Sequence, residues 1–386
     1  MFKGLGHTIK RELSRWNSRR VYLWGMILVP LAVAFFLLDL MNSGLPTQVP
    51  TAIVDLDDSP MSRNLTQSLG STELIKITDH ADSYHDAMQM VRSGKIYGFF
   101  VIPADFEAKA LSGGTPTLTY YSNMTYFVPG TLAFKGFKTM AVLSSGAIVE
   151  TSLEGRGISE DAAGTLLQPI VIDNHQLGNP WTNYSIYLSN SFIPGALELM
   201  IFIMTCFAVC EEVKRRTSRQ WLATANGSLT KALLGKLLPQ TVVFTVIGWF
   251  FDVVLFKFLH FPCGHFGNMI LAMPLFVIAC QSFALAICAM VPNLRLSLSL
   301  SSLTGILAFS IAGFSFPVDN MYGAIGIFSY ILPVRWYFLI YIDQALNGID
   351  IFYSRQYYMA LIVFFLVAAA LAPRLKKRLL NPVYVP

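Results

Sequence analysis

Three aspartates close together in the sequence are the first group that could do chemistry. Asp55, Asp57 and Asp58 follow a strand-like segment, and carboxylate oxygens are the ligands that Ca²⁺ prefers in proteins. Aspartates are also common in turns and at helix N-caps, where they accept hydrogen bonds from free backbone N–H groups. Because Ser59-Pro60 follows directly and proline favours the first turn of a helix, we expect turn and cap roles here.

Imidazole and thiol groups gather at two further places. His260, Cys263 and His265 share one loop, but a structural zinc site needs four ligands, so we expect ordinary loop residues. Cys206 and Cys210 lie four residues apart on one helical face, which is typical of small buried side chains in a packed helix. We therefore predict no metal site and no catalytic residue.

A nucleotide-binding loop is also absent from the sequence pattern. A P-loop reads G-x-x-x-x-G-K-[ST], since its backbone amides surround the phosphates and its hydroxyl binds magnesium. Gly235-Lys236 has Thr230 in place of the first glycine and Leu237 in place of the hydroxyl. Gly94-Lys95 fails in the same way. We expect neither a cofactor in this chain nor enzyme activity of its own.

Glu198 is a carboxylate in the middle of an apolar segment. A charged group at that depth in a membrane is costly, so it faces protein or water and often has a function. One interpretation is that Glu198 lines a substrate cavity. The other is that it makes a hydrogen bond between helices, and the sequence leaves both open.

The elements that hold Glu198, Cys206 and Cys210 are long apolar segments. The chain has 386 residues, is 54% apolar and only 13% charged, and has a mean hydropathy of +0.52. A helix of about 20 residues crosses the roughly 30 Å hydrocarbon core of a bilayer. Six segments qualify, near Val21–Met41, Leu188–Cys210, Ala232–Phe256, Met269–Val291, Ser297–Pro317 and Tyr357–Pro373.

The distribution of charge predicts which ends face the cytosol. Most of the 28 Lys and Arg residues lie in the N-terminal amphipathic segment 1–20, the segment 211–231 and the tail 374–386. The short loops on the other side carry only Lys257, Arg335 and Arg355. This asymmetry follows the positive-inside rule and places both termini in the cytosol. The net charge of +5 therefore indicates contacts with lipid headgroups rather than with nucleic acid.

Residues 42–187, between the first span at 21–41 and the remaining spans at 188–373, predict a domain outside the cell. Strand-like and helix-like stretches alternate there, which is typical of a small α/β domain. The expected strands are 51–55, 74–77, 96–102 and 118–121. One helix is expected to begin at Ser59-Pro60, and the others are expected at 81–92, 103–111 and 130–153. This domain contains no cysteine and thus depends on its own core.

Two features of the later spans concern packing. Small residues at helical spacing form one face of the fifth span, and small side chains let another backbone approach closely. This face could pack against a helix of the same chain, form a subunit interface or form the wall of a cavity. That face consists of Ser297, Ser301, Gly305, Ala308, Ala312 and Ser315. Beyond it, in the outer segment 318–350, Tyr322–Ile331 and Val334–Leu346 are apolar but too short to cross. They predict re-entrant or interfacial helices.

The segment between the second and third spans resembles a known family. Glu211–Thr217, followed by Leu229–Pro239, is similar to the cytosolic coupling segment of ABC-2 type (type V) ABC exporter permeases. Ile53–Ser62 and Gly98–Phe106 resemble the extracytoplasmic domain of the branch with a large insert after the first helix. Phe316–Asp319 resembles the outer re-entrant region of that family. Arg216 departs from the pattern, because the family usually has glycine at that position.

The resemblance implies a permease dimer, homomeric or heteromeric, that exports an amphipathic or lipophilic substrate such as a drug or lipid. ATP and Mg²⁺ would bind a separate ATP-binding subunit. A periplasmic adaptor and an outer-membrane channel are further possible partners, and the location implied is the bacterial inner membrane. Coupling to the ATPase would involve Glu211, Glu212, Arg215, Arg216, Thr217, Trp221 and Leu222. The substrate path would involve Glu198, Phe202, Ser301, Gly305 and Phe309.

The predicted fold is thus an α-helical membrane protein with six transmembrane helices and an inserted α/β extracytoplasmic domain. An alternative function is a membrane-anchored extracytoplasmic sensor or interaction protein without transport. A neighbouring gene for an ATP-binding subunit would favour export.

Overall fold

The computed structural model describes residues 3–42, 44, 47–112, 114–154, 179 and 183–381. The other residues of the predicted outer segment 42–187 lie outside this description, and so do residues 382–386 of the predicted tail. Contacts divide the chain into two compact units, Met1–Gly44 with Gln176–Pro386, and Leu45–His175. Each unit is described by itself below.

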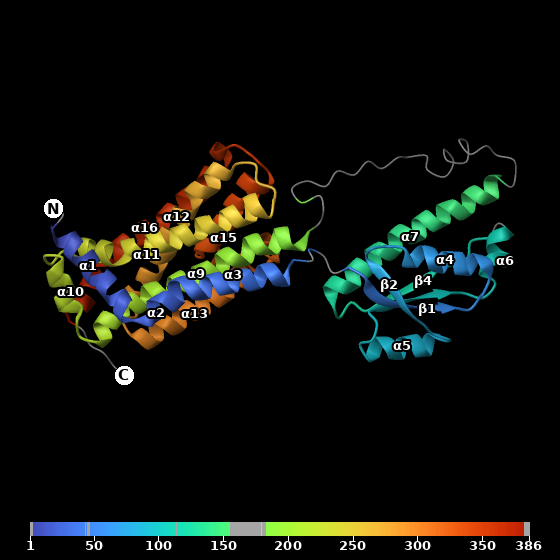
Figure 1. Ribbon diagram of the computed structural model, residues 1–386, viewed down its shortest axis with the longest axis horizontal. Helices are drawn as coiled ribbons and strands as arrows, with labels where there is room; N and C mark the ends of the chain where they lie inside the picture. The colour runs from blue at the N-terminus through green and yellow to red at the C-terminus, as the bar shows by residue number, and fades with distance from the viewer. Residues whose placement is uncertain are drawn as a thin grey trace. The chain divides into compact units, whose positions relative to one another are not determined.

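The first unit contains six helices long and apolar enough to cross a membrane, as the sequence predicts. Figure 1 shows these helices side by side. The first is built from α2 (Arg20–Leu23), the π-helical turn η1 (Trp24–Leu28) and α3 (Val29–Leu40). The others are α9 (Tyr184–Lys214), α11 (Leu229–Val253) continued by η2 (Val254–Phe258), α12 (Phe266–Met290), α13 (Leu294–Ile311) and α16 (Ile351–Leu380).

Helix α9 forms the centre of this unit. Apart from Tyr184 at its start and Lys214 at its end, its residues are buried or half-buried, and it packs against α3, α12 and α13. The small residues of α13 face it. An added Cβ at Gly305 would lie 2.6 Å from Leu199 Cδ1, so glycine is what permits this close approach. The small face of the fifth span therefore serves packing within the chain.

Two short helices fold into the bundle between α13 and α16. After the 3-10 turn η3 (Val318–Asn320), α14 (Gly323–Ser329) meets α15 (Pro333–Tyr341) at an angle of 79°, and η4 (Ile342–Leu346) extends α15. Pro333 occupies the first turn of α15, and Gly348 after η4 has a positive φ of 60°. This is the broken helix pair that the sequence predicts there.

The second unit is a four-stranded sheet with helices on both faces. The strands are β1 (Val49–Asp55), β2 (Ile75–His80), β3 (Gly98–Ile102) and β4 (Thr119–Ser122), in the order β2-β1-β3-β4. β1 is parallel to β2 and β3, whereas β4 is antiparallel to β3. The helices are α4 (Pro60–Gly70), α5 (Tyr84–Arg92), α6 (Phe106–Leu111) and α7 (Phe127–Glu154). The predicted α/β alternation is confirmed.

Successive strand residues point to opposite faces, and each face has its own core. Ile53 and Phe100 pack under α4, α6 and α7, while Ala52, Val54 and Phe99 pack under α5. Figure 1 shows α5 alone on its side of the sheet.

The aspartates after β1 have the turn and cap roles that the sequence favours. Asp55 accepts hydrogen bonds from the backbone N–H groups of Asp57 and Asp58 and from the hydroxyl of Ser62. Asp57 accepts from the N–H groups at the start of α6, at 2.8 Å and 3.1 Å. Hydrogen bonds, first of all from Ser59, lower the pKa of Asp57 below its ordinary value.

Candidate functional site

The N-terminal helix α1 (Lys3–Ser18) lies across the end of the bundle at which α9 stops and α11 begins. It is amphipathic, and it turns Thr8 and Glu12 inward. An added Cβ at Gly235 would lie 2.6 Å from Thr8 Cβ, so this glycine lets α1 approach the first turns of α11. Charged side chains from α1, α9 and α11 meet behind this contact, and we call this cluster the charged junction.

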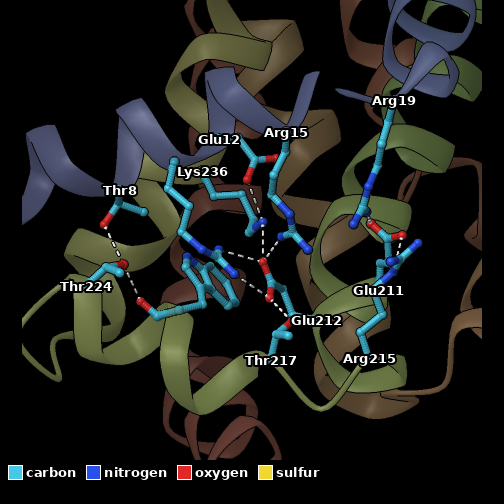
Figure 2. A network of polar contacts seen from close by, with 12 residues as sticks. Thr8, Glu12, Arg15, Arg19, Glu211, Glu212, Arg215, Thr217, Thr224 and Lys236 are labelled. Carbon is cyan, nitrogen blue, oxygen red and sulfur yellow. Dashed lines mark hydrogen bonds and ion pairs between the residues drawn. The ribbon is translucent and has the colours of Figure 1, made fainter. Parts of the chain in front are cut away.

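Glu212 is the centre of the charged junction. Its side chain is fully buried at the end of α9, where Arg11 donates to its two oxygens at 2.7 Å and 3.0 Å. Arg15 and the hydroxyl of Thr217 bind the same carboxylate. Lys236 of α11 completes the set with a bond of 2.9 Å to Glu212 Oε1. Figure 2 shows these groups converging on one carboxylate from three parts of the chain.

Lys236 is itself enclosed. Its ammonium is fully buried, donates to Glu12 at 2.7 Å and lies 4.8 Å from the centroid of the Trp221 ring. Its stem and the indole exclude water, so the pairing with two carboxylates offsets the cost of removing the charge from solvent. Lys236 is the residue that resembled a P-loop lysine in the sequence, and its role here is structural.

A second carboxylate extends the charged junction toward the surface. Glu211 binds Arg19 and accepts from Arg215 Nε at 2.9 Å. Burial lowers the pKa of both Arg11 and Arg15 from the ordinary value. A cluster of this kind makes the loss of a fully buried member such as Glu212 costly, because the remaining charges stay without a partner.

The short helix α10 (Ser218–Thr224) follows where the resemblance places a coupling helix. Trp221 and Leu222 are 0% and 2% exposed and face the core of their own chain. Both side chains therefore pack within the chain and present no apolar surface to a partner, and their expected role in coupling stays a prediction. The side chains that face outward are Lys214, Arg215, Arg216, Arg219, Gln220 and Ala223.

Glu211 and Glu212, which are also expected in the coupling segment, are likewise buried. Both are at most 4% exposed and are paired inside the chain, so they hold α10 in place and offer no surface to a partner. Arg216 has a left-handed φ of 57°, a conformation that favours glycine. This explains physically why a glycine is usual at this position in the family that the segment resembles.

The residues expected along a substrate path do not converge. Glu198 is fully buried and accepts a hydrogen bond of 2.9 Å from Val334 N–H at the start of α15, which is the interhelical alternative. Phe202 packs on Phe283 of α12, with ring centroids 4.9 Å apart. Both thus point away from α13.

The three path residues of α13 pack on α9. Ser301 Oγ lies 3.0 Å from Cys206 Sγ, Gly305 meets Leu199, and Phe309 contacts Phe192 with ring centroids 5.5 Å apart. Of the five expected path residues, only Phe309 has a partly exposed side chain. Within this chain alone the five side chains do not line one open space, and their place along a substrate path stays a prediction.

The charged junction was missed by the sequence reasoning. Arg11, Arg15 and Arg19 recur every four residues, which places them on one face of a helix, and this spacing was the available signal. Their common partners lie about 200 positions further along the chain, as the bond between Arg11 and Glu212 shows with a separation of 201. No local pattern could indicate that pairing.

A family model described as ABC-2 family transporter protein matches residues 20–372. No curated protein matches the chain.

Proposed function

Because the chain belongs to the ABC-2 transporter family, we propose that it is the membrane-spanning permease subunit of an ATP-driven exporter. The substrate class that we propose is an amphipathic or lipophilic molecule, such as a drug or a lipid, which leaves the cytosol or the inner leaflet. The chain would work as a dimer with separate ATP-binding subunits in a bacterial inner membrane, with both termini in the cytosol. An adaptor and an outer-membrane channel are possible further partners.

The observation that carries the proposal is the charged junction. Its buried ion pairs join α1, α9 and α11. Helix α10 is attached to this cluster through the bond of the Thr217 hydroxyl to Glu212, the Trp221 ring beside Lys236 and the contact of Thr224 with Thr8, so movement of α10 would move those helices with it. An ATP-binding subunit that pushes on α10 would therefore displace the ends of several spans at once. A mere membrane anchor, as in the sensor alternative, would not need such a linkage.

We place the contact with the ATP-binding subunit on the outward face around α10. Arg215, Arg216, Arg219 and Gln220 are exposed there, and basic side chains suit an acidic groove on a partner. For the substrate path we retain α9 and α13. The buried residues Glu198, Phe202, Ser301 and Gly305 would shape it from behind, and a second copy of the chain would complete it.

Copurification and transport test this function. Arg219→Glu reverses an exposed charge at the proposed contact, and we expect association with the cognate ATP-binding subunit to weaken at least about fivefold. ATP-driven uptake of a fluorescent amphipathic dye into inside-out vesicles should fall with it. The measurements are the affinity in detergent and the rate of dye uptake.

Arg355→Glu is the matched control, since Arg355 is also exposed but lies at the start of α16, at the other end of the bundle. It should leave the association unchanged. Failure of the wild-type chain to copurify with any ATP-binding subunit would exclude the proposed function. Equal effects of the two substitutions would exclude α10 from the contact.

A further inference from the structure

An apolar groove runs along the membrane-facing side of the first unit, between α12 and α16. It encloses about 530 Å³, which lies within the range of roughly 300–1,000 Å³ that is usual for ligand sites. Its walls are formed by Phe283, Ala286 and Met290 of α12 and by Ala360, Phe364 and Leu371 of α16. Because both helices are candidate spans, the surrounding solvent is lipid rather than water.

The turn between α14 and α15 closes one end of this groove. Tyr330, Ile331 and Trp336 line that end. Trp336 Nε1 donates to the carbonyl of Tyr330 at 3.0 Å, and the two rings lie 5.8 Å apart. Since the indole N–H is satisfied by this bond, the Trp336 ring presents carbon to the groove. An apolar chain fits here, and a polar ligand would find few partners.

The other end of the groove lies at the same end of the bundle as the charged junction. Met290 is the last residue of α12, and α16 continues past Leu371 to Leu380. There Ser218 and Arg219 donate to the carbonyls of Leu379 and Leu380, at 2.6 Å and 2.7 Å. The groove thus opens toward the side on which α1 and α10 lie.

Basic residues follow the groove at this open end. Arg374 and Arg378 come three and seven positions after Leu371, so they continue the same face of α16, and both are exposed. Helix α16 contains no acidic residue that would neutralise them. An apolar slot that ends at two guanidinium groups matches an acyl chain attached to a phosphate, and arginine binds phosphate through paired hydrogen bonds.

We propose that this groove binds an anionic phospholipid of the leaflet on the side of the charged junction. One acyl chain lies between α12 and α16 and reaches the turn at Tyr330 and Ile331, while the phosphate binds Arg374 and Arg378. The bound chain fills the space under the broken helix pair. Whether export occurs does not affect the test, because the readout is lipid binding.

Quenching of tryptophan fluorescence by brominated lipids tests the proposal. The complete chain is placed in nanodiscs of phosphatidylcholine that contain increasing fractions of brominated phosphatidylglycerol or of brominated phosphatidylcholine. Subtracting the signal of Trp336→Phe isolates the contribution of Trp336. We expect Trp336 to be quenched at a lower fraction of phosphatidylglycerol than of phosphatidylcholine.

Two pairs of variants separate the headgroup from the chain. The double variant Arg374→Gln, Arg378→Gln should reduce the preference for phosphatidylglycerol roughly fivefold for each arginine. The double variant Lys376→Gln, Lys377→Gln makes an equal change in charge away from the groove face and should preserve the preference. Ala360→Phe should fill the groove and abolish quenching of Trp336. Ala369→Phe, on an exposed face of the same helix, should leave quenching intact.

Three results would overturn the proposal. Equal quenching by phosphatidylglycerol and phosphatidylcholine would mean that Arg374 and Arg378 do not select an anionic headgroup. Equal quenching of Trp336 in Ala360→Phe and Ala369→Phe would mean that the lipid does not bind in the groove. A Trp336 that neither lipid quenches would mean that protein covers the groove, for example a second copy of this chain.

Discussion

Glu212 accepts hydrogen bonds from three cationic side chains and one hydroxyl in a site that water does not reach. Glu212→Gln keeps the size of the side chain and removes its charge, so Arg11, Arg15 and Lys236 would repel one another without a central anion. We expect a loss of about 3–5 kcal/mol in the free energy of unfolding, which is the cost of breaking a buried ion pair. Thermal unfolding of the detergent-solubilised chain measures it.

Arg215→Gln is the control within the same cluster. The Arg215 side chain is 55% exposed and pairs with Glu211 at i, i+4 spacing. Because Arg215 is largely solvated and Glu211 keeps Arg19 as a partner, we expect a loss of only about 0.3–0.5 kcal/mol, as for other i, i+4 pairs on helices, so the unfolding temperature should hardly change. Similar shifts for Glu212→Gln and Arg215→Gln would mean that solvent screens both pairs and that the charged junction is not a rigid link.

Glu198 tests whether a carboxylate in the middle of a span serves transport or packing. Its hydrogen bond to Val334 N–H caps the start of α15, and a glutamine oxygen can accept the same bond. We therefore expect Glu198→Gln to retain both stability and the rate of export. Glu198→Leu leaves that N–H without its acceptor and should cost about 1–3 kcal/mol of unfolding free energy.

Export by reconstituted vesicles and thermal unfolding of the same preparations distinguish the two roles of Glu198. A change in the preference for cationic substrates in Glu198→Gln, with unaltered stability, would contradict the packing role. It would mean that Glu198 acts on the substrate directly instead of shaping the path from behind.

At the scale of elements, the six spans and the strands of the α/β unit could be predicted, because each is encoded locally. An apolar run of sufficient length has to be helical in lipid, and Val, Ile and Phe in a short run such as Gly98–Ile102 favour a buried strand. The direction in which a short helix faces is not encoded in this way. In α10 the seven residues fit either an inward or an outward Trp221, and α1 and α11 decide it.

The contact between α13 and α9 gives a prediction about an element face. Gly305→Leu inserts a side chain where Leu199 already lies, with an added Cβ only 3.2 Å from the Leu199 Cα. Overpacking of a close helix contact should lower the free energy of unfolding by about 1–3 kcal/mol. Ser310→Leu on the exposed side of the same helix should have little effect.

Unfolding temperatures of the two α13 variants, measured in the same detergent, provide the comparison. If Gly305→Leu is as stable as Ser310→Leu, α13 can move away from α9 at little cost. The small residues would then serve a movable contact, such as a path between subunits, rather than fixed packing.

At the scale of the whole molecule, the sequence predicted a layout but not its internal links. The apolar runs and the charge asymmetry indicate which segments lie on which side of the membrane. The pairing of Glu12 with Lys236 depends on helices that come together only after folding, with a separation of 224 positions in the sequence. The site residues were hence predicted less well than the elements that carry them.

The orientation of the chain is itself testable by labelling of single cysteines. Ser218, although in the predicted cytosolic segment, is fully buried and bound to the carbonyl of Leu379, so a cysteine there would be silent on either side. Gln220 is exposed on α10, and Ser112 is exposed at the end of α6. A Cys263→Ser background removes the only native cysteine that the structure leaves partly exposed.

A membrane-impermeant thiol reagent should then label Ser112→Cys in intact cells, or in spheroplasts if an outer membrane is present. Gln220→Cys should react only after the membrane is permeabilised. The reverse pattern would place α1, α10 and the basic tail outside, and with them the proposed contact with a cytosolic ATPase would fail.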